Sequence, residues 1–293
     1  MRLAKFVDRF RIDKPEKFRL AKCDPTDTCG MDVDKKEAKQ LLTDGIARLS
    51  ELQELLYAQD RWSVLAIFQA MDTAGKDSAI KHVMSGINPQ GCEVHSFKRP
   101  SEEDYDHDFL WRSSKHLPER GRIGIFNRSY YEEVLVVRVH KDALQREKLP
   151  ADLVDGDIWK RRFKDIRAHE KYLGRNGTRL VKFYLHLSKA EQKRRLLERI
   201  DTPAKNWKFS MGDLAERRRW DQYMAAYEDM IRNTSTPDAP WYVVPADHKW
   251  FTRLVVAAAI VRSLEELRLE FPALNRAARA ELTKARRLLA REK

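Results

Sequence analysis

The stretch WSVLAIFQAMDTAGKDS, residues 62–78, decides the fold. Residues 62–71 form a continuous apolar run rich in β-branched and aromatic side chains, which is typical of a strand covered on both faces of a parallel sheet. A helical pattern over 76–86 follows at once. A strand that runs through a short loop into a helix predicts a phosphate-binding turn, because backbone N–H groups at a helix N-terminus attract anions.

The loop between this strand and this helix partly matches the P-loop pattern G-x-x-x-x-G-K-[ST]. Gly75 and Lys76 match the pattern, whereas Ala70 replaces its first glycine. Asp77 stands where the hydroxyl that binds Mg²⁺ is expected, and Ser78 follows one place later. The position of the loop, after an apolar strand and before an amphipathic helix, favours phosphate binding despite these departures.

Acidic residues in the loop offer a site for Mg²⁺. Asp72 lies inside the loop, and its carboxylate is the kind of oxygen ligand that Mg²⁺ prefers. Capping of the helix N-terminus is the alternative role for Asp72 and Asp77, and capping is compatible with metal binding. The predicted phosphate-binding residues of the loop and helix are Ala74, Gly75, Lys76, Asp77, Ser78 and Lys81.

Strands and helices alternate along most of the chain. Further short strands are expected at 92–97, 122–126, 179–187 and 241–245, and helices at 35–59, 101–116, 151–173, 188–200, 211–233 and 250–270. This order predicts a doubly wound α/β fold with a parallel sheet of about five strands, whose ligand crevice lies at the carboxyl ends of the strands. We expect an irregular arm over 1–34, a single domain over 35–270 and a basic helix over 271–293.

The predicted third strand ends at Asn127 and Arg128. P-loop proteins keep a carboxylate at this place, so Asn127 is a departure from their pattern. Arg128 would direct a planar guanidinium into the same crevice, where its donors match phosphate oxygens. Glu132, Glu133 and Arg138 follow, and we expect them to bind nucleotide together with Asn127 and Arg128. The alternative for these three residues is an ordinary charged helix face.

A basic segment separates the fourth and fifth predicted strands. Residues 189–219 are rich in lysine and arginine, and Pro203 interrupts them between two helical patterns. This order, a helix followed by a basic loop and a second helix, predicts a lid over about 188–220 that closes on phosphates. Arg194, Arg195 and Arg199 lie on adjoining turns of the first helix, so they can converge on one anion. A solvated basic hairpin is the alternative. The candidate binding residues of the lid are Arg194, Arg195, Arg199, Lys205 and Lys208.

Composition limits the class of protein. The 293 residues carry 57 basic and 45 acidic side chains, a net charge of +12, and 42% are hydrophobic, which excludes intrinsic disorder. A basic surface alone does not distinguish nucleic acid, an anionic membrane or a phosphate-rich polymer as partner. No apolar run is long enough to span a membrane and no signal peptide is visible, so we expect a cytoplasmic protein with three free cysteines. The basic tail predicts a solvated helix packed on the body or on a partner subunit.

Four motifs together resemble the second family of polyphosphate kinases, in the same order across most of residues 35–265. They are AMDTAGKDS (70–78), GINPQG (86–91), FNRSYYEEVLVVRV (126–139) and NWKFSMGDL (206–214). The resemblance implies a three-layer α/β/α P-loop kinase fold akin to thymidylate kinase. It also implies dependence on Mg²⁺, with Mn²⁺ as an alternative ion, and reversible phosphoryl transfer between inorganic polyphosphate and the nucleotides AMP, ADP and ATP. We expect a homodimer or homotetramer without a nucleic-acid or membrane partner.

The resemblance also implies roles for individual residues. Asp72 resembles a metal ligand, Lys76 a clamp on phosphate and Arg128 the arginine that stabilises the transition state. The five basic residues of the lid resemble the cover over a polyphosphate channel. Asn127 differs from the Asp of the family's nucleoside-diphosphate kinases and resembles the subclass that also accepts nucleoside monophosphates, so AMP and ADP are both expected acceptors.

Two other functions compete with this interpretation. An ATP-dependent nucleoside or nucleotide kinase of the same fold would require the standard P-loop, from which Ala70 and Asp77 depart. A basic nucleic-acid-binding protein would leave Asp72 in a phosphate loop unexplained, and no recognition module is visible. Phosphoryl transfer needs mainly alignment and charge neutralisation, so no acid–base pair or nucleophile has to be found.

Overall fold

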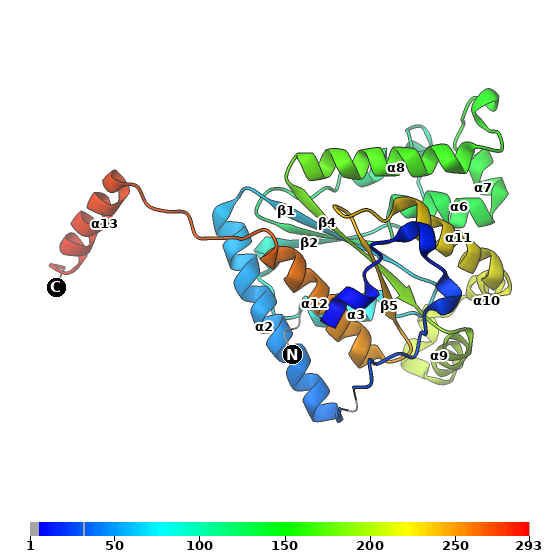
Figure 1. Cartoon of the computed structure of the whole chain (residues 1–293), viewed down its shortest axis with the longest axis horizontal. Helices are drawn as coiled ribbons and strands as arrows, with labels where there is room; N and C mark the ends of the chain where they lie inside the picture. Colours follow the sequence, from blue (N-terminus) through cyan, green and yellow to red (C-terminus); the bar gives the residue numbers. More distant parts are fainter. Residues whose placement is uncertain (1–5, 32, 293) are drawn as a thin grey trace.

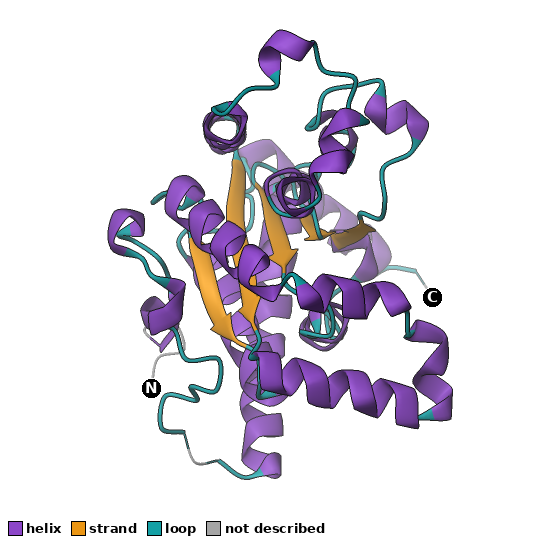
Figure 2. Cartoon of the chain, turned by 90° about the vertical axis from the view of Figure 1, so that its right-hand side faces the viewer, coloured by secondary structure: helices purple, strands orange, loops and turns teal. Residues whose placement is uncertain are grey.

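The computed structural model describes residues 6–31 and 33–292, which form an α/β fold around a parallel sheet. Within these residues the sheet has five strands in the order β2-β3-β1-β4-β5. They are β1 (Ser63–Gln69), β2 (Cys92–Ser96), β3 (Ile123–Asn127), β4 (Thr178–His186) and β5 (Trp241–Pro245). Helices cover both faces of the sheet (Figures 1 and 2). The predicted fold class is therefore confirmed, and each predicted strand is correct to within two residues at either end.

Two hydrophobic cores form because side chains alternate across the strands. Val64 and Ala66 of β1 pack in one core, while Leu65 and Ile67 pack in the other, so every residue of β1 is buried. The first core is closed by the helices α2 (Lys35–Gln59), α3 (Lys76–Val83) and α12 (Lys249–Glu265). The second is closed mainly by α8 (Ile158–Arg175) and α11 (Trp220–Thr234).

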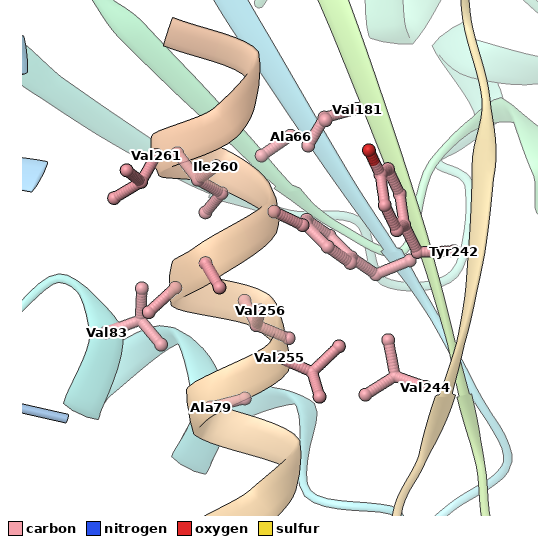
Figure 3. Packing of buried hydrophobic residues seen from close by; sticks show 14 of the residues in the cluster. Ala66, Ala79, Val83, Val181, Tyr242, Val244, Val255, Val256, Ile260 and Val261 are labelled. Carbon is pink, nitrogen blue, oxygen red and sulfur yellow. The ribbon is translucent and has the colours of Figure 1, made fainter. Parts of the chain in front are cut away.

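The helix α12 contains the most apolar run of the chain, residues 254–261. Figure 3 shows α12 between the sheet and α3: Val255 of α12 points toward Val244 of β5, and Val83 of α3 lies on the other side of the helix. All residues of this run are buried, as expected for a helix packed between a sheet and other helices. No helix within the described part of the chain is long and apolar enough to cross a membrane.

Several predicted helices are shorter or divided. The other described α-helices are α4 (Glu102–Tyr105), α5 (Trp111–Ser114), α6 (Val136–Val139), α7 (Lys141–Gln145), α9 (Lys189–Asp201), α10 (Met211–Arg218) and α13 (Arg276–Leu289). The helix predicted over 101–116 is wrong in its centre, because the Asp108 carboxylate accepts a hydrogen bond from the Leu110 N–H and turns the chain. The Asp155 carboxylate likewise accepts a hydrogen bond from the Asp157 N–H, and α8 begins at Ile158 instead of the predicted residue 151.

One further predicted helix is divided in the lid. The helix predicted over 211–233 breaks at Arg219, whose N–H bonds to the carbonyl of Glu216 in a tighter turn. The break separates α10 from α11 and lets α10 lie at the carboxyl end of the sheet (Figure 1). The three cysteines are free thiols, as predicted.

The N-terminal arm, predicted to be irregular, is part of the core. It contains short 3-10 helices at Val7–Phe10, Pro15–Lys17 and Leu20–Lys22. The rings of Phe6 and Phe10 pack edge to face on Phe251 of α12, with centroids 5.5 and 5.8 Å away. Arg11 forms an antiparallel bridge with Tyr242, so the arm covers the outer edge of β5. These contacts join residues far apart in sequence, and local periodicity gives no sign of them.

The C-terminal helix α13 lies away from the body. Figure 1 shows it at the end of an extended segment, beyond α2 and α12. Its residues are all exposed except Ala278, which is half-buried. A helix is present here as predicted, and it is solvated as expected, but it does not pack on the body. The alternative expectation, that it packs on a partner subunit, stays a prediction.

A buried ion pair joins the sheet to α8. Lys182 of β4 donates to the Glu170 carboxylate at 2.6 Å and to the carbonyl of Thr234 at 2.8 Å. Tyr130 and Tyr131 donate to the other carboxylate oxygen of Glu170 at 2.9 and 2.6 Å. Lys182 is completely buried, and burial lowers its pKa. The network holds each buried charge against a partner and so fixes α8 on this face of the sheet.

We expect Lys182→Met to lower the free energy of unfolding by about 3–5 kcal/mol, because it leaves the Glu170 charge buried without its cation. The double variant Lys182→Met/Glu170→Gln should recover part of this loss, since the amide oxygen still accepts from the tyrosines. Lys160→Met is the control, because Lys160 pairs with Asp157 at the surface and its loss should cost less than about 1 kcal/mol. Urea unfolding measures all three, and an unchanged midpoint for Lys182→Met would contradict a stabilising role for the pair.

Candidate active site

Two cavities at the carboxyl ends of the strands share one wall. The first, which we call the α6 cavity, has a volume of about 320 Å³ and lies against α6 and α7. The second, the α9 cavity, has a volume of about 640 Å³ and lies between α3, α9 and the start of α12. Asp72, Lys98, Arg99 and Arg128 line both cavities. A group transferred from one cavity to the other would pass these four residues.

The loop after β1 presents a helix N-terminus and a lysine to the α9 cavity. Gly75 precedes α3 with a φ of 101°, a conformation that favours glycine. Lys76 begins α3, and its Nζ donates to the carbonyl of Ala70 at 2.9 Å. Burial lowers the pKa of Lys76, and the nearby Arg128 guanidinium lowers it further. A poorly solvated cation at a helix N-terminus is well placed to bind a phosphate.

Arg128 and Asp72 meet where the two cavities join. Arg128 Nη2 lies 3.2 Å from Asp72 Oδ1, and its Nη1 lies 3.9 Å from a carboxylate oxygen of Glu132. The nearby Glu132 carboxylate, followed by that of Asp72, raises the pKa of Arg128. Arg128 also has a φ of 65°, which is unusual for a residue with a side chain. Such strain is characteristic of functional sites, where the surrounding structure holds it in place.

Asn127 lies on the α9 side of this wall. Its Nδ2 donates to the Asp77 carboxylate at 2.7 Å and lies 3.4 Å from the Ser96 hydroxyl. It lines the α9 cavity with Asp77 and Ser78, and Ser78 accepts a hydrogen bond from Arg253 of α12. The amide therefore links the end of β3 to the first turn of α3.

The lid places some of its predicted residues in the α9 cavity. Arg199, Lys205 and Lys208 line the cavity, and Arg199 is held by the Asp213 carboxylate at 2.8 Å. Arg194 does not converge with them, because it lies on the solvent side of α9 and pairs with Glu191 at 2.6 Å. Neighbouring residues on a helix point about 100° apart, so the sequence alone could not show which arginines face the cavity.

Arg195 also borders the α9 cavity, but its side chain is 4% exposed. Its guanidinium makes five hydrogen bonds of 2.7–3.1 Å, to Glu191 and to four backbone carbonyls. These bonds occupy its five donors, so the predicted convergence of Arg195 with Arg194 and Arg199 on one anion is not observed.

The α6 cavity is lined by three of the residues predicted to bind nucleotide, one of which is Arg128. Glu132 and Glu133 line it, whereas Arg138 lines neither cavity and pairs with Asp229 at 2.6 Å. Glu133 is buried against the guanidinium of Arg162. Burial raises the pKa of Glu133 to about 8, with a further contribution from the Glu147 carboxylate.

Other predicted residues lie outside the cavities. Ala74 is buried beneath the loop and contributes its carbonyl to Arg195, while the exposed Lys81 lies further along α3 and lines neither cavity. Sequence reasoning also missed several lining residues. They are Lys98, Arg99 and Lys249 on the basic side, and Phe109, Val136, Val137, Tyr223 and Tyr227 on the apolar side. Lys98 and Arg99 closely follow the second predicted strand, and this position could have identified them as lining residues from the sequence.

The residues at the shared wall fit a divalent cation. Asp72 is half-buried, and the Thr73 hydroxyl next to it is buried without a hydrogen-bond partner. Burial raises the pKa of Asp213, and the Asp72 carboxylate raises it further, which indicates two acids in the same region. These oxygen donors suit Mg²⁺, which commonly binds through one or two carboxylates together with substrate phosphates. Among the described residues there is no cluster of three or more His, Cys, Asp or Glu side chains that could hold a metal alone.

Two named proteins are similar to this chain over more than nine tenths of its length. The sequence is 53% identical over 282 residues to the ADP-polyphosphate phosphotransferase of Rhodopseudomonas palustris, covering 96% of this chain and 97% of that protein. It is 44% identical over 266 residues to the AMP/ADP-polyphosphate phosphotransferase of Meiothermus ruber, covering 91% and 96%.

A solved structure and a family profile extend these matches. The crystal structure of polyphosphate kinase 2 from Arthrobacter aurescens superposes with a TM-score of 0.85 at 42% identity, covering 95% of this chain and 96% of that one. The profile of the family Polyphosphate kinase 2 (PPK2) matches residues 32–272. The resemblance seen in the sequence motifs is therefore confirmed, and this chain belongs to the polyphosphate kinase 2 family.

Proposed function

We propose that this protein reversibly transfers phosphoryl groups between inorganic polyphosphate and adenine nucleotides, converting AMP to ADP and ADP to ATP. The wall shared by the two cavities is the observation that carries this proposal. Polyphosphate occupies the α9 cavity, where Lys76, Arg199 and Lys205 are among the many cations that line it. The nucleotide occupies the α6 cavity, whose aromatic and aliphatic side chains suit a base and ribose.

The reaction requires the two substrates to meet at Asp72 and Arg128. A phosphate oxygen of the nucleotide attacks the terminal phosphorus of polyphosphate, the bond to the penultimate phosphate breaks, and the polymer leaves one unit shorter. Arg128 stabilises the charge on the transferred group, and Lys76 neutralises the polymer end. Lys98 and Arg99 line both cavities and keep the two anionic substrates close together.

Mg²⁺, with Mn²⁺ as an alternative, is the proposed cofactor. Asp72 would hold the ion, with the adjacent Thr73 hydroxyl as a neighbouring oxygen group. Bound there, the metal would neutralise phosphate charge during transfer. Removal of divalent ions with EDTA should abolish turnover, and added Mg²⁺ should restore it.

Other expectations from the sequence stay predictions. They are a cytoplasmic location, a homodimer or homotetramer, the absence of a nucleic-acid or membrane partner, and the division into an arm, a single domain with a lid, and a tail. Light scattering coupled to size-exclusion chromatography measures the subunit count directly.

One assay tests the proposed function. The protein is incubated with Mg²⁺, long-chain polyphosphate and either ADP or AMP, in the absence of ATP, and the nucleotides are separated by chromatography. We expect ATP from ADP, and ADP followed by ATP from AMP. Absence of these products, together with turnover of ATP and a nucleoside, would instead favour a conventional ATP-dependent kinase.

Substitution of Lys76 or Arg128 tests the cations at the transferred phosphate. We expect Lys76→Met and Arg128→Met each to lower kcat by about 10³-fold or more, since a comparable arginine contributes that much in other phosphoryl-transfer enzymes. Lys39→Met, an exposed lysine of α2 outside both cavities, should leave kcat unchanged. Near-full turnover in either site variant, with an unaltered melting temperature, would show that its assigned role is wrong.

The lid lysines should act mainly on the polymer. We expect Lys205→Met/Lys208→Met to raise the KM for polyphosphate about fivefold with little change in the KM for ADP, because partly exposed cations each contribute up to about 1 kcal/mol. Added salt should also raise the wild-type KM for polyphosphate by screening these charges. Lys36→Met/Lys39→Met is the control, because it removes the same amount of positive charge from α2, outside both cavities. A salt-independent KM that the double lid variant leaves unchanged would place the polymer elsewhere.

Asn127→Asp should bias the enzyme toward ADP. The substitution places a carboxylate beside that of Asp77, which the amide now contacts at 2.7 Å. The added negative charge should hold the metal more firmly and repel an acceptor phosphate from alternative positions. We therefore expect the ratio of kcat/KM for AMP to that for ADP to fall. An unchanged ratio would leave Asn127 as a structural link between β3 and α3, and a wild type inert toward AMP would refute the dual-acceptor proposal.

A further inference from the structure

The lid helix α9 holds the phosphate loop by its backbone. Gln192 Nε2 donates to the carbonyl of Asp72 at 3.1 Å. Arg195 Nη1 donates to the next two carbonyls, those of Thr73 at 3.1 Å and Ala74 at 3.0 Å. Three successive carbonyls of the loop are therefore bound by two side chains one helical turn apart.

Binding these carbonyls also orients the N–H groups of the loop. A peptide unit is planar and trans, so its C=O and N–H point in opposite directions. Fixing the carbonyls of residues 72–74 thus directs the N–H groups of residues 73–75 away from α9. The Ala74 N–H closes a turn onto Met71, while Thr73 and Gly75 border the α9 cavity. The two α9 side chains therefore set the surface that the loop presents to a phosphate.

The loop needs such support because its backbone is unusual. Thr73 has a φ of 64°, in the left-handed region that disfavours side chains other than glycine. Gly75 follows with a φ of 101°. A conformation of this kind costs about 1–3 kcal/mol and persists only where the surroundings hold it. Without its bonds to α9, the loop would relax toward more ordinary conformations.

The same two side chains connect the loop to other parts of the fold. Arg195 Nη2 donates to the carbonyls of Ala246 and Asp247, which follow β5, at 2.7 and 3.0 Å. Gln192 Oε1 accepts from Arg217 of α10 at 2.9 Å. Both α9 residues are at least 95% buried. The loop is thus tied to the end of β5 and, through Gln192, to the second helix of the lid.

We propose that Gln192 and Arg195 are positioning residues for phosphoryl transfer, and that they couple the position of the lid to the geometry of the phosphate loop. Arg195 does not bind polyphosphate directly, because its donors are filled by Glu191 and four carbonyls. Movement of α9 toward a bound polymer would instead shift residues 72–74 and align the loop. This inference rests on the proposed function.

Two substitutions test the inference, one that removes many hydrogen bonds to the loop and its surroundings and one that removes a single bond. Arg195→Met removes all five hydrogen bonds, while Gln192→Glu keeps an acceptor for Arg217 and loses only the donor to Asp72. Lys193→Met is the matched control, because Lys193 lies between them on α9 but is exposed and lines neither cavity. Arg195→Lys is included because a lysine can restore one or two of the carbonyl bonds.

Steady-state kinetics should show an effect on kcat rather than on KM. We expect Arg195→Met to lower kcat about 10²-fold and Gln192→Glu by a smaller factor, because a small misplacement of reacting groups can cost that much. The KM for polyphosphate should change less than about threefold, Arg195→Lys should recover part of the rate, and Lys193→Met should match wild type. A rise in KM for polyphosphate with unchanged kcat in Arg195→Met would overturn the proposal and make Arg195 a direct ligand.

Hydrogen exchange gives a readout that does not depend on activity. In the protein without substrates, exchange in a peptide spanning residues 71–78 should be faster in Arg195→Met and Gln192→Glu than in wild type and Lys193→Met. Equal exchange in all four proteins would refute the positioning role. If Arg195→Met does not fold, Gln192→Glu and Arg195→Lys still decide the matter. Failure of wild type to make ATP from polyphosphate would refute the proposed function, whereas the exchange result would still stand.

Discussion

The contact between Arg128 and Asp72 is the constraint on which the site depends. Parallel pairing of β1 with β3 sets Phe68 opposite Asn127, so the residues that follow both strands emerge at the same edge of the sheet. A charged pair there, 3.2 Å apart, forms a wall with a basic cavity on one side and a more apolar cavity on the other. The rest of the molecule supports this wall: two cores fix the strands, and α9 borders the cavity on the basic side.

The amino-acid sequence was most informative where the signal is local. The continuous apolar run of β1 and the Gly75-Lys76 turn after it predicted both a buried parallel strand and a phosphate loop. Four motifs in the family's order predicted the fold and activity class. The direction in which a helical side chain points was harder to predict. Arg194 and Arg195 are neighbours of the same type, yet Arg194 faces solvent and Arg195 is buried. Lys249 belongs to no local pattern, and only tertiary packing brings it to the α9 cavity.

Arginine serves three distinct purposes within six residues of the lid. Arg194 forms an exposed ion pair, Arg195 satisfies buried carbonyls, and Arg199 lines the α9 cavity while held by Asp213. The planar guanidinium, with five donors in fixed directions, makes the second role feasible in a way that lysine cannot reproduce. The net charge therefore does not show how many cations can bind the substrate, because several of them already form ion pairs or hydrogen bonds within the protein.

The position of the N-terminal arm has a consequence for biosynthesis. The partners of Phe6, Phe10 and Arg11, which are Phe251 and Tyr242, are synthesised more than 200 residues later than these three residues. The aromatic rings of the arm consequently lack these partners until β5 and α12 have been made. The arm therefore cannot close the edge of the sheet until this late part of the chain has been made, and chaperones that bind exposed aromatic segments have access to the arm throughout that interval.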